Sequence, residues 1–192
     1  SFVCADIKGT GVKIATEKVT EIFDIWPLLG SEVLTKHQSN DYIELFFRNG
    51  SMFDIINSGI GTRGIRRTSG ILEEAVLLDG EEVNERVLPT LNISRKDCMG
   101  NMYPDEPTQS QAWITSAGPK ACYAYEKLLE ITVMSIIHPE SAYVCGGDYR
   151  IPVKVGLMNK SYIDDMKMSS TFKEDSFARE ILSIWTGASS ES

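Results

Sequence analysis

Two adjacent carboxylates close a short apolar run in the sequence SGILEEA, where Glu73 and Glu74 follow Leu72. We predict that this run is a central strand, because it is apolar, short and bounded by polar residues. A strand that ends in two acids suits phosphoryl transfer with Mg²⁺. The first acid holds the metal, usually through water, and the second polarises the attacking water. The alternative is a strand that simply ends at a solvated acidic helix cap.

Small hydroxyl residues close a second apolar run, AWITSAGPK, in which Thr115 and Ser116 precede Ala117. We predict a short buried strand here, one strand–helix unit after the acid pair. Ligands of open α/β sheets bind at the carboxyl ends of strands, so the acids and the hydroxyls would meet at one sheet edge. There the hydroxyls could sense a γ-phosphate or hydrogen-bond the attacking water. The alternative is that they only end the strand.

Arg63, Arg66 and Arg67 lie in a Gly-rich segment just before the acidic strand. Arginine suits phosphate recognition because its planar fork donates two parallel hydrogen bonds. One of these arginines could clamp a nucleotide of its own or a neighbouring subunit, as an arginine finger does. The others could contact DNA phosphates. A solvated basic loop that offsets nearby acids is the alternative.

In the first half of the chain, the residue pattern predicts a strand over 2–6, a helix that Pro27 ends, and a hairpin over 42–57. Asn49-Gly50 is the hairpin signal, and we expect positive φ at both turn positions. The helix has one apolar face, made by residues three and four apart: Val12, Ala15, Val19, Ile22, Phe23 and Trp26.

The second half predicts a helix within 80–97, a loop over 96–110 and a helix that begins near Ala121. Residues 131–137 could end that helix or form another strand. A last helix would begin with a capping box from Thr171 to Glu174. The inward residues would be Val83, Val87, Leu88 and Leu91, then Tyr125, Leu128 and Leu129, and finally Phe177, Ile181, Ile184 and Trp185. Alternating strands and helices predict a parallel α/β sheet with one inserted hairpin.

Composition excludes several classes of protein. The net charge of −8 argues against a general nucleic-acid coat but allows a local basic patch. Four scattered cysteines and two histidines do not match the ligand spacing of a zinc site, and they favour reduced thiols in a cytosol. No apolar run reaches the length of a membrane span. The first residues lack the positive region and long apolar stretch of a signal peptide.

In order and spacing, these segments resemble the ATPase domain of the large terminase subunit, the motor that packages DNA in tailed bacteriophages. The segments that carry the resemblance are FVCADIKGTG, the helix to WPLL, IELFFRNGS, RGIRR, GILEEA, the helix to LPTL, AWITSAGPK and SFAREILSIWTG. They cover most of residues 1–187. The order and spacing are specific, whereas no single motif is decisive.

The resemblance implies a RecA-like P-loop NTPase of the ASCE type: a mostly parallel sheet flanked by helices, with ATP and Mg²⁺ as cofactors. GILEEA would be the Walker B strand, with Glu73 at the metal position and Glu74 as the catalytic carboxylate. Thr115, Ser116 and Ala117 would be the coupling motif that relays hydrolysis to DNA movement. Arg63 stands where the family's candidate trans-acting finger lies, and Arg66 and Arg67 would be further phosphate contacts.

The resemblance also implies partners and a place of action. These are double-stranded DNA, the phage portal, the small terminase subunit and a homo-oligomeric ring, in the cytoplasm of the infected bacterial host and without a membrane. We predict an ATPase core over residues 1–158 and a helical segment over 159–192, which leads toward a nuclease domain outside this chain.

Two features depart from the family pattern. The metal position usually holds Asp, and Glu73 is one methylene longer. The sequence contains no G-x-x-x-x-G-K motif followed by Ser or Thr; KGTGVK at 8–13 has the wrong spacing. We therefore expect a fragment, with the phosphate-binding loop upstream of FVCA and the isolated chain inactive. The alternatives are another P-loop motor, such as a helicase, and a non-catalytic module that assembles with a partner supplying the loop.

Overall fold

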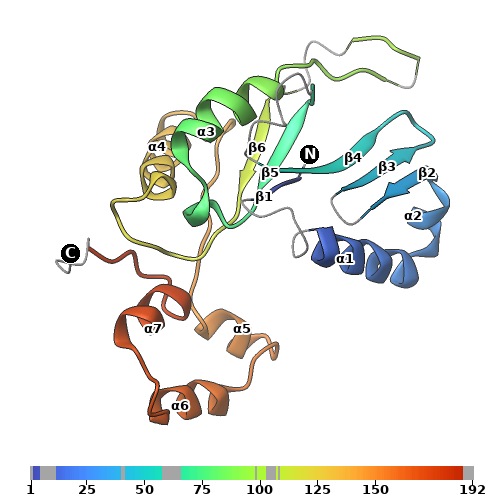
Figure 1. The fold of residues 1–192 in the computed structure, drawn as a ribbon. Helices are drawn as coiled ribbons and strands as arrows, with labels where there is room; N and C mark the ends of the chain where they lie inside the picture. The colour runs from blue at the N-terminus through green and yellow to red at the C-terminus, as the bar shows by residue number, and fades with distance from the viewer. Residues whose placement is uncertain are drawn as a thin grey trace. The chain divides into compact units, whose positions relative to one another are not determined.

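The computed structural model describes residues 2–4, 12–39, 42–57, 66–97, 99–102, 107 and 109–187 (Figure 1). The chain divides into two compact units, Ser1–Ile114 (unit 1) and Thr115–Ser192 (unit 2). Each unit is described by itself. The predicted boundary at residue 158, between an ATPase core and a helical segment, stays a prediction.

Within the described residues of unit 1, a six-stranded mixed sheet has the strand order β2-β3-β4-β1-β5-β6. The strands are β1 (Phe2–Cys4), β2 (Val33–Gln38), β3 (Ile43–Phe47), β4 (Met52–Asn57), β5 (Ser69–Leu72) and β6 (Ser110–Trp113). β1 pairs in parallel with both β4 and β5, and β5 pairs in parallel with β6. β2 and β3 add an antiparallel extension beyond β4. The predicted mixed α/β class, with a hairpin joined to parallel strands, is confirmed.

The hairpin forms between β3 and β4, as the sequence predicts, but its turn differs from the expected one. Gly50 N donates to Phe47 O over 3.0 Å, and Phe47 N donates to Ser51 O over 2.9 Å. Gly50 has φ of +82°, whereas Asn49 is not among the residues with positive φ. The Asn49 side chain instead accepts a hydrogen bond from Ser51 N. The loop therefore contains a single left-handed glycine, and it is longer than the two-residue loop that is commonest in hairpins.

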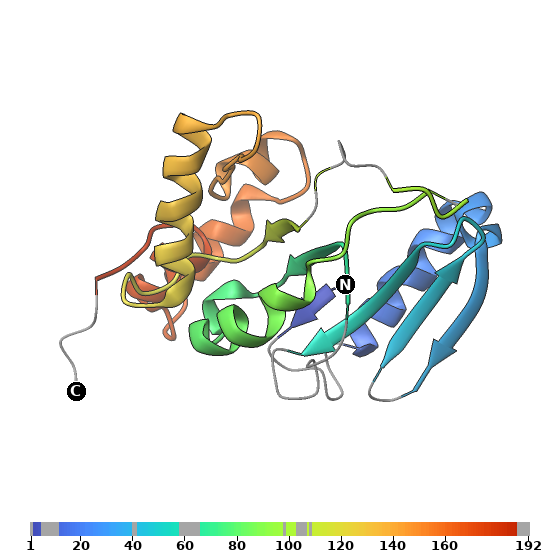
Figure 2. The same ribbon diagram turned by 90° about the horizontal axis from the view of Figure 1, so that it is seen from above.

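α1 (Val12–Ile25) covers the hairpin with the predicted apolar face. Ala15, Val19 and Phe23 pack against a buried cluster of Ile43, Leu45 and Ile55. Figure 2 shows the helix lying along the strands of the hairpin. Burial of these side chains is the main favourable term that holds the helix to the sheet.

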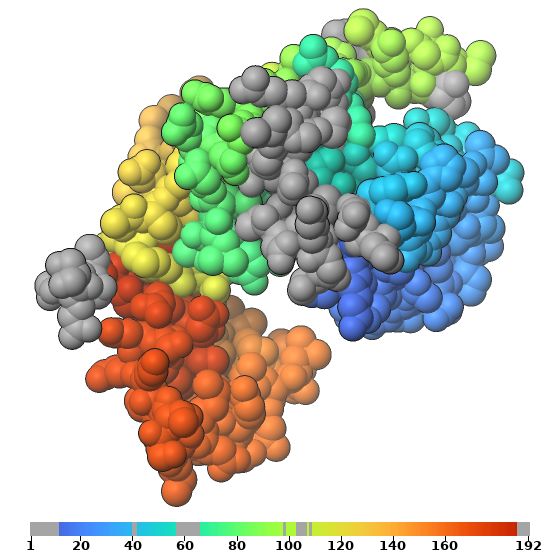
Figure 3. Space-filling model, viewed as in Figure 1, coloured from blue at the N-terminus to red at the C-terminus, as the bar shows by residue number. Residues whose placement is uncertain are grey.

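Pro27 separates α1 from the next helix, as the sequence predicts. α2 (Pro27–Ser31) begins with that proline, a position where the missing N–H costs nothing. Trp26 lies at the junction of the two helices and is 60% exposed, and Ile22 is 37% exposed, so the predicted place of both in the packed face of α1 is wrong. The outer sides of α1 and α2, blue in Figure 3, form part of the surface of unit 1.

Residues 80–90 form one helical segment that packs against the sheet with the fully buried Val83 and Val87, and with Leu91, which directly follows it. It consists of α3 (Gly80–Glu82), a π-turn η4 (Val83–Val87) and a 3₁₀ turn η5 (Leu88–Thr90). Leu88 N donates to Val83 O, which is the wide spacing of a π-turn. Pro89 explains this geometry, because in a regular helix its ring would clash with the carbonyl four residues before it. The helix therefore ends at Thr90, and residues 91–97 of the predicted segment are not helical.

Unit 2 contains α4 (Tyr123–Ile137), α5 (Arg150–Lys154), α6 (Lys160–Met168) and α7 (Glu174–Glu180) among its described residues. Residues 131–137 are the end of α4, which settles the open choice between helix and strand. Leu129 is 49% exposed, so its predicted inward position is wrong. α6 lies within the segment of residues 159–192 that the sequence predicts to be helical, and Asn159 begins it by accepting a hydrogen bond from Ser161 N.

The last helix of unit 2 begins two residues later than a capping box at Thr171 would place it. Its N-cap is Lys173, and the Thr171 hydroxyl instead contacts Ser169 Oγ at 2.9 Å. α7 ends at Glu180, so only Phe177 of the predicted apolar stripe lies on the helix, where it is buried. Ile184 is 50% exposed, so its predicted inward position is wrong. Trp185, beyond the helix, packs its ring 5.2 Å from that of Tyr125. No helix among the described residues is long and apolar enough to cross a membrane.

Candidate nucleotide site

The acid pair lies at the carboxyl ends of three parallel strands. β5 pairs with β1 on one side and with β6 on the other, and Leu72 aligns with Val3 and Trp113. Two further main-chain bonds continue the pairing beyond the strands: Ile114 N donates to Leu72 O over 2.9 Å, and Ala75 N donates to Ile114 O over 3.2 Å. Glu73 and Glu74 are therefore held between two anchored residues. Ligands of open α/β folds bind at this edge of the sheet.

Glu74 has a left-handed backbone, with φ of 49° and ψ of 47°. This conformation costs a non-glycine residue on the order of 1–2 kcal/mol. The turn is maintained by η3 (Ala75–Leu77), in which Leu77 N donates to Glu74 O and Ala75 is buried. Backbone strain of this kind persists only where the surrounding structure enforces it, and it occurs often at functional sites. The strain occurs at the residue that the sequence singles out as the catalytic acid.

The two carboxylates differ in environment. Glu73 is half-buried and Glu74 is exposed. Burial raises the pKa of Glu73, and the negative charge of Glu74 raises it further. A cation at this edge would offset both effects, because it would stabilise the ionised form of each acid.

Mg²⁺ fits the chemistry of these two acids, since it prefers hard oxygen ligands and keeps several waters. The described residues contain no group of three or more His, Cys, Asp and Glu that could hold a metal by themselves. An ion here would take one or two carboxylates from the chain, and water and phosphate oxygens would supply its other ligands. Sites that bind Mg²⁺ together with a nucleotide are built in this way.

β6 confirms a strand at the second apolar run, but not its predicted burial. Gln111 and Ala112 are exposed, and β6 is an edge strand of the described sheet. After it, Thr115 is exposed, Ser116 is half-buried and Ala117 is buried. The Thr115 hydroxyl donates to Ser116 O over 2.9 Å. These three residues belong to unit 2, whereas the acid pair belongs to unit 1.

Arg66 and Arg67 lie at the opposite, amino end of β5. Arg63 lies outside the described residues, while Arg66 and Arg67 come shortly before Ser69, where the strand begins. A strand rises about 3.3 Å per residue, so the four residues of β5 separate these arginines from Glu73 by about 13 Å or more.

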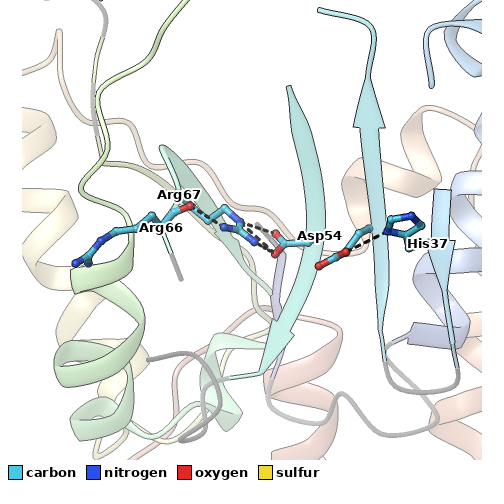
Figure 4. A network of polar contacts seen from close by, with 5 residues as sticks. His37, Asp54, Arg66 and Arg67 are labelled. Carbon is cyan, nitrogen blue, oxygen red and sulfur yellow. Dashed lines mark hydrogen bonds and ion pairs between the residues drawn. The ribbon is translucent and has the colours of Figure 1, made fainter. Parts of the chain in front are cut away.

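Arg67 is bound to Asp54, which lies in the middle of β4 and is 3% exposed (Figure 4). Arg67 Nε donates to both carboxylate oxygens over 3.1 Å, and Nη2 forms an ion pair with Oδ2. The sequence analysis did not identify Asp54. The sequence does contain a feature that marks this residue, namely one acid within the apolar strand run MFDIIN. A carboxylate buried in such a strand needs a charged or hydrogen-bonding partner.

The described fold is an α/β fold with acidic residues at the carboxyl edge of its parallel strands. Solved structures with a similar fold include those of the large terminase from the thermophilic bacteriophage D6E. One crystal form has a TM-score of 0.57 at 11% identity, and it covers 96% of this chain and 40% of the terminase. Complexes of the same terminase with ATP-γ-S and with ADP have TM-scores of 0.56 and 0.57, at 13% and 12% identity.

The comparison confirms, at the level of fold, the resemblance to large terminases. The chain spans about two fifths of the length of those terminases, 39% and 40% in the two nucleotide complexes. No protein-family model matches the sequence, and neither does any curated protein.

Proposed function

We propose that this chain is part of the ATPase of a large terminase, the motor that moves viral double-stranded DNA into a procapsid. The observation that carries the proposal is the shared fold over 96% of the chain, together with an acid pair at the carboxyl edge of its parallel strands. The D6E terminase binds ATP-γ-S and ADP, which supports nucleotide binding by the complete protein. The core would be a RecA-like fold of the ASCE type.

In this function Glu73 would hold Mg²⁺, through water or directly, and Glu74 would orient and polarise the attacking water. Mg²⁺, when bound, would neutralise charge on the nucleotide phosphates. The main-chain hydrogen bonds at Leu72 and Ala75 fix the backbone on both sides of the acids, which would limit backbone reorganisation during the reaction. Glu73 is longer than the usual Asp, and its side chain would have to fold back to reach the same ion position.

The remaining assigned residues would act on phosphates or couple hydrolysis to movement. Thr115, Ser116 and Ala117 would form the coupling motif, and Arg63 would be a finger that reaches the ATP of a neighbouring subunit. Arg66 and Arg67 are proposed to serve phosphate recognition. The motor would act as a homo-oligomeric ring, with the portal and the small terminase subunit, in the cytoplasm of the infected bacterium.

The test of this function is ATP hydrolysis by the complete protein and by its Glu74→Gln variant. Glutamine keeps the shape of the side chain but cannot accept a proton, and a general base contributes about 10²–10⁴ in rate. We expect turnover to fall by about this factor while ATP-γ-S binding is kept. Glu81→Gln, an exposed acid on α3, is the matched control and should keep full turnover. Near-full turnover in Glu74→Gln would instead make Glu73 the candidate catalytic acid.

A further inference from the structure

The peptide unit between Arg66 and Arg67 is held at both of its polar groups. Arg67 N donates to Thr90 O over 2.8 Å, and the guanidinium of Arg67 donates through Nη1 to Arg66 O over 2.6 Å. Ile93 N donates in turn to Arg67 O over 3.3 Å. The main chain at this point is therefore fixed to the segment that follows the helix of residues 80–90.

The Arg67 side chain completes this arrangement from the other side. It is 18% exposed, and its Nε and Nη2 both reach the buried carboxylate of Asp54 on β4. A buried ion pair adds little net stability compared with apolar side chains of the same volume, and one attested use of such pairs is to specify a unique arrangement. Arg67 thus links β4, the peptide of Arg66 and the Thr90 segment.

Arg66 is oriented differently. Its side chain is exposed and extends away from Asp54 and Arg67 (Figure 4). No hydrogen bond or ion pair of the Arg66 guanidinium occurs among the described residues. With its main chain fixed, this guanidinium is presented outward from the amino end of β5, about 13 Å or more from the acid pair at the other end.

We propose that Arg66 binds a phosphate of a ligand outside the nucleotide site of its own chain, and that Arg67 is a positioning residue for Arg66. The Arg67–Asp54 pair, on this proposal, does not contact phosphate itself. The phosphate could belong to duplex DNA or to a nucleotide held by a neighbouring copy, since both present the same oxygens to a guanidinium. This inference refines the role that the proposed function gives to Arg66 and Arg67, and it rests on that function.

The test compares three variants of the complete protein: Arg66→Gln, Arg67→Lys and the double variant Asp54→Leu/Arg67→Met. Lysine keeps the charge opposite Asp54 but lacks the fork that reaches Asp54 and Arg66 O together. The double variant replaces the ion pair by apolar side chains, which is often tolerated. Arg48→Gln removes another exposed arginine of unit 1 and is the control for loss of one charge. Thermal melting shows which variants are folded.

Binding is measured with a labelled 30-base-pair duplex over a range of salt concentrations, and separately with a fluorescent ATP analogue at low and high protein concentration. One lost DNA phosphate contact lowers the slope of log K against log salt by about 0.9. We expect this decrease in Arg66→Gln and in each folded Arg67 variant, but not in Arg48→Gln. Adding Arg66→Gln to an Arg67 variant should cause no further decrease. If the ligand is a neighbour's nucleotide, the same pattern appears in the analogue's affinity, and only where the protein self-associates.

Three results would overturn the proposal. Folded Arg67 variants with unchanged binding would leave Arg67 a purely structural residue. A larger loss in Arg67→Lys than in Arg66→Gln would make Arg67 the ligand, and equal losses in Arg66→Gln and Arg48→Gln would indicate general charge attraction. In these cases the wild type still binds DNA and hydrolyses ATP, so the proposed function stands. A wild type that does neither would overturn both.

Discussion

At the scale of single residues, the acid pair is in an unfavourable state unless a cation offsets it. Glu73 is half-buried beside another carboxylate, and Glu74 has a left-handed backbone. Neither feature stabilises the fold, and both are accounted for if this edge binds a cation, as the proposed function requires. Functional residues are often less stable in their native environment than substitutes would be.

Glu73→Gln should therefore stabilise the chain at neutral pH. Burial and the charge of Glu74 raise the pKa of Glu73 above its ordinary value of 4.5. The ionised form is thus disfavoured in the folded state, and stability that is present below the unfolded pKa is lost as pH rises through the folded pKa. We expect a higher melting temperature for Glu73→Gln than for the wild type at pH 7, and no difference at about pH 3.5, where both states are protonated.

Melting curves at both pH values, without divalent cations, check this expectation. Glu17→Gln, an exposed acid on α1, is the control and should not show the same pH-dependent gain. If Glu73→Gln melted at the same temperature as the wild type at pH 7, the raised pKa would have no consequence for stability. The argument that the acid pair is destabilised in the absence of a cation would then fail.

At the scale of secondary-structure elements, the close packing of β5 on the helical segment of residues 80–90 positions the acids. Gly70 on β5 is the contact point, because a Cβ atom there would lie 3.1 Å from Leu91 Cδ1 and 3.3 Å from Cδ2. Leu91 is fully buried, so it has little room to move. The glycine is needed for close approach of the strand to Leu91, and its backbone does not need a positive φ.

Gly70→Ala should destabilise the chain by about 1–3 kcal/mol, as overpacked core substitutions do. Leu91→Ala in the same background should cost less than Leu91→Ala alone, because the smaller side chain accommodates the new methyl group. The free energies of unfolding in urea measure both effects. Gly146→Ala is the control, since no atom lies within 4 Å of the added Cβ there. A Gly70→Ala cost no greater than that of the control would show that the strand and helix can separate easily.

At the scale of the whole molecule, the candidate residues divide between the two units. The acid pair and the described arginines belong to unit 1, and Thr115, Ser116 and Ala117 belong to unit 2. The proposed ATPase also needs a phosphate-binding loop, and the 192 residues contain none with the Walker A spacing. The complete site would therefore draw on more than this chain.

The isolated 192-residue chain should hydrolyse ATP no faster than a buffer control, since the lysine and backbone N–H groups that hold the β- and γ-phosphates are missing from its sequence. A phosphate-release assay on the purified chain measures this. Steady turnover that Glu74→Gln abolishes would show that the chain holds a working nucleotide site by itself. It would also weaken the alternative of a non-catalytic module that needs a partner to supply the loop.

Arg63 should act across a subunit boundary in the complete protein. A finger in trans neutralises charge on the transferring phosphoryl group, and its loss costs on the order of 10³–10⁵ in kcat. We expect Arg63→Ala and Glu74→Gln subunits to be inactive alone, and mixed assemblies to regain part of the activity, because some interfaces carry both intact groups. Titrating one variant into the other while measuring hydrolysis is the check. If the variants co-assemble and no ratio restores activity, Arg63 acts in cis or on DNA.

The sequence alone determined the features that depend on near neighbours. The hairpin at Asn49-Gly50, the apolar face of α1, the stop at Pro27 and the strand before Glu73 were all predicted, because local patterns set turns, helix faces and short strands. The order of these segments also predicted the terminase-like fold that the structural comparison shows. The turn type, the helix end after Pro89 and the exposure of β6 were not predicted correctly.

Only the tertiary structure decided which distant residues meet. β2 (Val33–Gln38) has no alternation of apolar and polar side chains, and it forms because β3 supplies main-chain hydrogen bonds. Arg67 looked in the sequence like one more phosphate contact, yet it pairs with Asp54, which is 13 residues away in the chain. The reason is physical: a buried carboxylate must find a partner, and the sheet brings β4 and the start of β5 close enough for one arginine to reach it.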